Sequence, residues 1–421
     1  MLNTYQIERL CNIAYLDVLT DDINKNSLAH IMDYMLGEGF GKEGTLPVLM
    51  TRQEWDRVAL DIIADSELGG LFVAKFTDDS KTGHRAFCFT SGKQGGDLYI
   101  IFRGTHKDAE WFDNARGMFL AETESQKAAL DFVFAVRRTL PAGKIIVAGH
   151  SKGGNKAQYC AIAAGDTVDL CVSVDGQGFS RLFFEKYNDI IESAKSRIIS
   201  VAERRDFVNC LGFYLKKPEF YSGGRGDKSE SFPYGQPLQY FHCPDGLRIN
   251  DGSFGQTAQV SYISEAINSF VVFFLSEKKY AQKAEKIAHG LVSLMTESRH
   301  ERQAAEALAD AALIFFEFTA KSKDFREKLH DIFVNESDVI AATSHTVRNS
   351  NEGHNEIADT AMKIFAEKLL LKPRYFRYFI TNIERYTVYT KKVKKGKEKA
   401  RHVNHFIKGI FGHIEKLKHK K

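Results

Sequence analysis

Residues 149–153 read Gly-His-Ser-Lys-Gly and fit the pattern G-x-S-x-G. They lie between the apolar run 144–148 and a stretch with helical periodicity that ends near position 165. A serine on such a strand-to-helix turn is typical of a nucleophile elbow, because small flanking residues allow a turn tight enough to expose the hydroxyl. We therefore predict that Ser151 is a nucleophile; the alternative is a chance turn. His150 is interpreted as a packing residue, since adjacent side chains on this turn point apart.

A nucleophilic serine needs a general base and a carboxylate that orients the base. In hydrolases with this elbow the chain order is Ser, acid, His. Asp206 leaves a β-like run and is the predicted acid, while Asp175, which ends the preceding strand, is the runner-up acid. His242 is the predicted base, because it is the only histidine between Asp206 and the helical C-terminal part. The alternative for each of these residues is an ordinary loop position.

Acyl transfer also needs N–H donors for the developing oxyanion. One donor is the backbone N–H of Lys152, directly after the nucleophile. Thr105 is the second, since it follows the apolar strand 98–102 and Gly104 lets the backbone come close to a substrate. The six cysteines are scattered without a C-x-x-C pair, so we expect no metal site and no cofactor.

Four apolar runs, 98–102, 144–148, 170–174 and 197–201, alternate with helical stretches. This alternation predicts an α/β fold with a mainly parallel sheet flanked by helices on both faces. Two earlier runs, 71–76 and 86–89, read as strands, residues 1–65 as helices, and 210–258 as irregular. We expect three parts: an α/β-hydrolase-type domain over 1–275 with a helical N-terminal segment, a helical annex over 276–390, and a basic tail over 391–421.

The composition, 43% hydrophobic and 27% charged over 421 residues, excludes a disordered chain, a collagen-like chain and a small disulfide scaffold. The tail 391–421 holds twelve Lys or Arg and two acidic residues, so it carries +10 and the rest of the chain −6. Its basic and apolar residues favour docking on an anionic membrane. Nucleic-acid binding is the rival, supported by charge alone, and a solvated tail is the third interpretation.

The chain shows neither a secretory signal nor an apolar run of the roughly 20 residues that span a bilayer. With its scattered cysteines, this predicts a cytoplasmic protein, which would be membrane-associated if the tail docks on an anionic membrane. The segment 211–239 mixes aromatic residues with glycines. It is interpreted either as a lid over an acyl site or as an ordinary surface excursion.

The sequence resembles a known family at several motifs. Ile-Phe-Arg-Gly-Thr at 101–105, followed by Gly-His-Ser-Lys-Gly-Gly at 149–154, resembles the class 3 lipases. Residues 175–178 are similar to the family's Phe-Gly-x-Pro stretch, although the proline is missing, and 204–208 to its Asn-Asp-x-Val acid loop. The chain resembles most the uncharacterised bacterial lipase-like proteins of the Mbeg-like group. The region around 239–251 is not close to the lipases.

The resemblance covers about residues 65–275 and implies an α/β-hydrolase fold, with Ser151, Asp206 and His242 on the positions of nucleophile, acid and base. We expect a serine hydrolase that cleaves carboxylic esters, with an acyl ester or lipid as substrate, through an acyl-enzyme. The alternatives are a catalytically silent binding or scaffold protein, or a peptidase or thioesterase with the same triad. The sequence fixes neither the acyl group, the leaving group, the oligomeric state nor the role of the annex.

Overall fold

The computed structural model describes residues 1–17, 26–38, 48, 50–79, 82–93, 95–106, 110–141, 143–225, 240–249, 252–295, 301–323, 325 and most of 360–368. The chain divides into two compact units, one of residues 1–227 and 238–268 and one of 228–237 and 269–421. The basic tail 391–421, and with it the membrane-docking hypothesis, lies outside the described residues.

The described residues of the first unit form one eight-stranded sheet whose strands lie in chain order. Neighbours from β3 to β7 pair in parallel, whereas β1, β2 and β8 join antiparallel at the two edges. The mainly parallel sheet expected from the sequence is therefore confirmed. The strands are β1 (Phe72–Asp79), β2 (His84–Thr90), β3 (Leu98–Phe102), β4 (Ile145–His150), β5 (Leu170–Val174), β6 (Ile198–Glu203), β7 (Glu219–Ser222) and β8 (Gln256–Thr257).

The prediction that 210–258 is irregular is wrong at β7 and β8. β7 extends the sheet beside β6, and β8 pairs with β7. β7 has four residues, of which Phe220 alone is buried, and both residues of β8 are exposed. Such short segments carry no readable alternation of apolar and polar residues. The stretch 219–222 belongs to the sheet, while 226–239 of the proposed lid lies outside the described residues.

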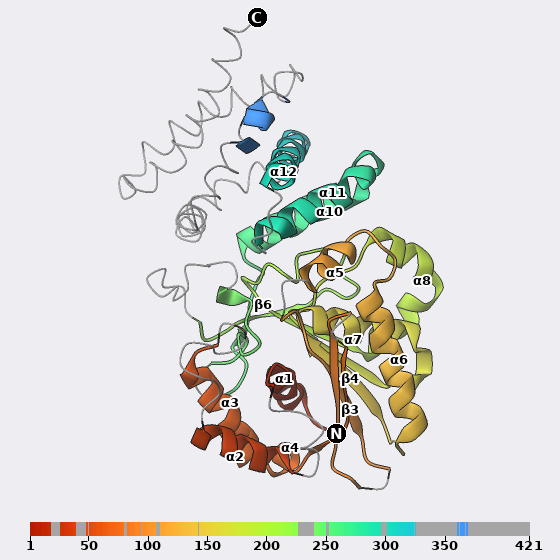
Figure 1. Cartoon of the computed structure of the whole chain (residues 1–421), viewed down its shortest axis with the longest axis vertical. Helices are drawn as coiled ribbons and strands as arrows, with labels where there is room; N and C mark the ends of the chain where they lie inside the picture. The colour runs from red at the N-terminus through yellow and green to blue at the C-terminus, as the bar shows by residue number, and fades with distance from the viewer. Residues whose placement is uncertain are drawn as a thin grey trace, which may run out of the picture. The chain divides into compact units, whose positions relative to one another are not determined.

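Helices cover both faces of the sheet (Figure 1). One face packs against α1 (Thr4–Ile13), α2 (Leu28–Glu38), α3 (Arg52–Ala64) and α4 (Ser66–Gly69). The other packs against α6 (Glu124–Thr139), α7 (Lys152–Ala163) and α8 (Arg181–Ala194). A capping box begins α1, α3 and α6, and the box of Thr123 and Gln126 at α6 agrees with the sequence pattern.

Alternation along the strands explains why the sheet has two cores. In β3, Tyr99 and Ile101 point into the core shared with α1 to α4. Ile100 and Phe102 point into the core shared with α6 to α8. Successive side chains of a strand face opposite sides, so a fully apolar strand must be covered twice. The N-terminal helices are therefore an integral layer of this fold.

The described part of the second unit is helical. It contains α10 (Tyr262–Ser276), which begins in the first unit, together with α11 (Lys278–Met295) and α12 (Glu301–Lys321). Phe270 packs against Phe315 and Phe318, and Lys279 pairs with Glu317. Across the described residues, none of the helices is both long and apolar enough to span a membrane.

Candidate active site

Ser151 sits on a strained turn between β4 and α7. Its backbone has φ 61° and ψ −127°, a region that side chains other than glycine rarely adopt. A Cβ on Gly153 would lie 2.1 Å from the Phe102 carbonyl oxygen, so the turn excludes any larger residue there. The Ser151 side chain does not cap α7, although Ser151 is its N-cap residue. The hydroxyl is thus available for another partner, as a nucleophile elbow requires.

His242 supplies that partner from a loop 91 positions further along the chain. Its Nε2 lies 2.8 Å from Ser151 Oγ, and its Nδ1 lies 2.9 Å from Asp206 Oδ1. The three side chains predicted from the sequence therefore meet in one chain of hydrogen bonds. With Nδ1–H donated to the carboxylate, Nε2 is the acceptor that faces the serine hydroxyl. This is the tautomer that a general base needs.

Asp206 is fully buried and held by four hydrogen-bond donors. Besides the imidazole, the backbone N–H groups of Val208 and Asn209 donate at 3.1 and 3.0 Å, and Asn209 Nδ2 donates at 2.9 Å. A buried carboxylate is stable only with such compensation. The Asn209 contribution was missed from the sequence, although its position three residues after the acid is typical of a local Asx turn.

Asp175, the runner-up acid, has a different environment. It directly follows β5 and has a positive φ of 46°, and its Oδ1 accepts from the Glu203 N–H at 2.7 Å. Among the described residues its other oxygen has no hydrogen-bond partner. Burial, and then the neighbouring Asp206 carboxylate, raise the pKa of Asp175 well above its ordinary value. The structure therefore brings Asp206, and not Asp175, to the imidazole.

The two segments that carry the predicted oxyanion donors adjoin Ser151. A Cβ on Gly104 would lie 3.0 Å from Ser151 Cβ, which shows how closely this loop approaches the nucleophile. Thr105 Oγ1 accepts from Asn114 Nδ2 at 2.6 Å, so its hydroxyl braces the loop. The Lys152 side chain pairs with Asp113 at 3.1 Å. Its N–H opens α7, where a helix leaves N–H groups unpaired and favours negative charge.

His150 is buried, as predicted for a packing residue, but it also contacts the base. Its ring stacks on His242 with centroids 4.6 Å apart, and its Nδ1 lies 2.9 Å from Tyr15 Oη. Burial, and secondarily His242, lower the pKa of His150 well below its ordinary value, so the ring is neutral. Tyr15 also packs against the oxyanion loop, since a Cβ on Gly104 would lie 2.1 Å from Tyr15 Oη. Nothing in the sequence singled out Tyr15.

The described residues contain no group of three or more His, Cys, Asp or Glu side chains arranged to hold a metal ion. The six cysteines are buried as free thiols. Burial raises the pKa of each thiol that shows a resolved shift, and a buried neutral thiol is a poor nucleophile.

The Mbeg1-like family model matches residues 64–211. This segment is therefore similar to the Mbeg1-like family. It contains Ser151 and Asp206 and ends before His242.

Three solved structures are similar at low identity. The Rhizomucor miehei lipase propeptide complex is 15% identical with a TM-score of 0.33, and the match covers 52% of this chain and 66% of that one. The M37 lipase is 14% identical with a TM-score of 0.30, and the match covers 50% of this chain and 69% of that one. A triacylglycerol lipase from Penicillium expansum is 14% identical with a TM-score of 0.28, and the match covers 45% of this chain and 82% of that one. The chain spans just under two thirds of the Rhizomucor chain. A search of the curated proteins found no match.

Proposed function

We propose that this chain is a serine hydrolase that cleaves carboxylic esters. The observation that carries the proposal is the pair of hydrogen bonds that joins Ser151 Oγ to His242 Nε2 at 2.8 Å and His242 Nδ1 to Asp206 at 2.9 Å. The strained elbow and the two flanking N–H groups support it. Each of these features has a separate role in acyl transfer, and together they match the requirements of one reaction.

The proposed reaction has two steps. His242 removes the proton from Ser151 Oγ as this oxygen attacks the ester carbonyl, and the N–H groups of Thr105 and Lys152 stabilise the oxyanion. The imidazolium, held by Asp206, returns the proton to the departing alkoxide and leaves an acyl-serine. His242 then takes a proton from water, the resulting hydroxide attacks the acyl carbonyl, and the same proton restores Ser151 as the carboxylic acid departs.

Hydrolysis of short p-nitrophenyl esters tests the proposal. We expect the wild-type protein to release p-nitrophenol with saturation kinetics and Ser151→Ala to lose the activity while keeping its melting temperature. Ser193→Ala is the matched control, because that serine is exposed on α8 and donates only to the Ile190 carbonyl. Turnover by Ser151→Ala equal to that of the wild type would refute the proposal. An inert wild type would favour a binding or scaffold protein instead.

A further inference from the structure

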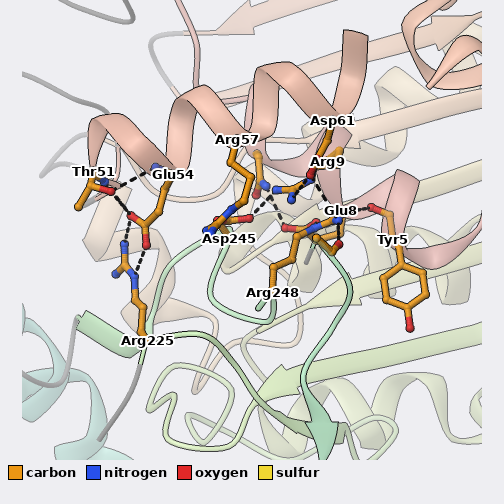
Figure 2. Close-up of polar contacts among 12 residues, drawn as sticks. Tyr5, Glu8, Arg9, Thr51, Glu54, Arg57, Asp61, Arg225, Asp245 and Arg248 are labelled. Atoms are coloured by element: carbon orange, nitrogen blue, oxygen red, sulfur yellow. Dashed lines mark hydrogen bonds and ion pairs between the residues drawn. The ribbon is translucent and has the colours of Figure 1, made fainter. Parts of the chain in front are cut away.

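Ion pairs join the N-terminal helices to Asp245 in the loop that carries the base, residues 240–249, and to Arg225, which hydrogen-bonds to the start of that loop (Figure 2). Neither the helix residues that make these contacts nor the loop lies within the matched segment 64–211, because Arg9, Glu54 and Arg57 precede it and the loop follows it. The matched segment thus contains the nucleophile and the acid, while the base and its supports come from outside it. This division points to a role for α1 and α3 beyond covering the sheet.

Asp245 is the centre of the ion pairs after His242. It is completely buried, three residues after the base, and each of its oxygens accepts from a different helix. Arg9 Nη1 of α1 contacts Oδ1, and Arg57 Nη2 of α3 contacts Oδ2. Arg9 also donates a hydrogen bond from Nη2 to Asp61 Oδ2 of α3, at 2.5 Å. The carboxylate therefore ties the loop to both helices at once.

A second ion pair holds the loop before His242. Arg225 makes a two-pronged contact with Glu54 of α3, at 2.8 and 2.7 Å, and its Nη1 donates to the Tyr240 carbonyl at 2.5 Å. Glu54 is itself fixed, since it accepts from the Thr51 N–H in the capping box of α3. Planar, bidentate Arg–carboxylate pairs fix orientation as well as distance.

A third pair fixes the far end of the loop. Arg248 Nε donates to the fully buried Glu8 of α1 at 2.7 Å, and its Nη2 donates to the Tyr5 carbonyl at 2.5 Å. Buried charges are tolerated only when paired in good geometry, so each contact disfavours other placements of the loop. His242 is thus bracketed by fixed points two residues before it and three and six residues after it.

We propose that α1 and α3 position the imidazole of His242 through the Arg9–Asp245–Arg57 ion pairs, which makes Arg57 and Asp245 positioning residues of the reaction. The inference rests on the proposed function. A displacement of about 1 Å at a reacting group costs on the order of 100-fold in rate. These ion pairs act on the position of the loop and not on substrate binding. Their loss should therefore lower kcat and leave KM nearly unchanged.

Arg57→Gln is the variant that tests this inference, because Arg57 is partly exposed and Asp245 keeps Arg9 as a partner. The matched control is Arg52→Gln on the same helix, whose guanidinium pairs with Asp56 and donates to the Leu36 carbonyl. We expect Arg57→Gln to lower kcat on a short p-nitrophenyl ester about 10- to 100-fold with KM within about twofold. Arg52→Gln should change neither, and Arg57→Lys, which restores a cation, should recover most of kcat.

A second readout does not need activity. The proton between His242 Nδ1 and Asp206 should give a downfield proton NMR resonance, assigned by its loss in His242→Gln. We expect it in the wild type and in Arg52→Gln, and shifted or broadened in Arg57→Gln. If the resonance is unchanged in Arg57→Gln, or both arginine variants lose the same activity, the inference is overturned. If the wild type hydrolyses no ester, the proposed function fails and the resonance alone decides the positioning role.

Discussion

Replacing Asp206 by asparagine tests the assignment of the acid most sharply. The two carboxylate oxygens accept four hydrogen bonds: His242 Nδ1 and the Val208 N–H donate to Oδ1, and Asn209 N and Nδ2 donate to Oδ2. An asparagine amide has one oxygen and one NH2 group. Its NH2 must therefore face either His242 Nδ1 and the Val208 N–H, or the two donors of Asn209. Facing the imidazole, it would force Nδ1 to accept and leave the proton on Nε2, the atom that must take the proton of Ser151.

The expected loss follows from that tautomer. In a serine protease the corresponding substitution costs about 10⁴ in kcat, so for Asp206→Asn we expect a fall of about 10³- to 10⁴-fold, or roughly 4 to 5.5 kcal/mol at the transition state. Asp175→Asn is the matched control. Burial, and then the Asp206 carboxylate, raise the pKa of Asp175 and so favour its neutral form, and an amide oxygen can still accept from the Glu203 N–H.

Steady-state kinetics on a short p-nitrophenyl ester would measure both variants, and their melting temperatures would report on folding. We expect kcat of Asp175→Asn within about threefold of the wild type. An equal loss in the two variants, or a large loss in Asp175→Asn alone, would refute the assignment of Asp206 as the acid.

Two further predictions concern the loop before the elbow and a buried lysine. In Gly104→Ala the new Cβ would lie 2.1 Å from Tyr15 Oη and 2.6 Å from the His150 carbonyl oxygen, so the oxyanion loop must shift. We expect kcat to fall about 100- to 1000-fold. A Gly104→Ala variant with wild-type kinetics would contradict this. Burial lowers the pKa of Lys156 from 10.5 to about 7. The unfolded chain then binds more protons between these values, so stability rises with pH across that window. Lys156→Met should therefore resist urea better than the wild type at pH 7, by an advantage that shrinks towards pH 10; an equal advantage at both pH values would contradict it.

Much of the central sheet was predictable, because β3 to β6 are apolar runs that alternate with helices. The elbow was predictable for a steric reason, since only glycine fits at position 153 against the Phe102 carbonyl. Chain order alone then left Asp206 and Asp175 as two candidates at neighbouring strand ends. What separates them is three-dimensional: the Asp206 carboxylate collects four donors, one of them the imidazole, while the Asp175 carboxylate collects one N–H.

The supports of the site could not be predicted from the sequence. Arg57 and Asp245 are 188 positions apart, and Glu8 and Arg248 are 240 apart, so no local spacing relates the partners. Tyr15 reaches His150 over 135 positions for the same reason. Such contacts become visible only after the helices of residues 1–69 pack on the sheet, because packing selects which of many charged side chains meet.

Covalent labelling with a fluorophosphonate tests the central claim most directly, because only a serine activated by its base attacks the phosphorus. After trypsin cleavage the reagent mass should appear on the peptide of residues 145–152, which contains Ser151. We expect this adduct in the wild type and its loss in His242→Gln and Ser151→Ala. A folded wild-type protein that leaves Ser151 unmodified, or an adduct that persists undiminished in His242→Gln, would contradict the account.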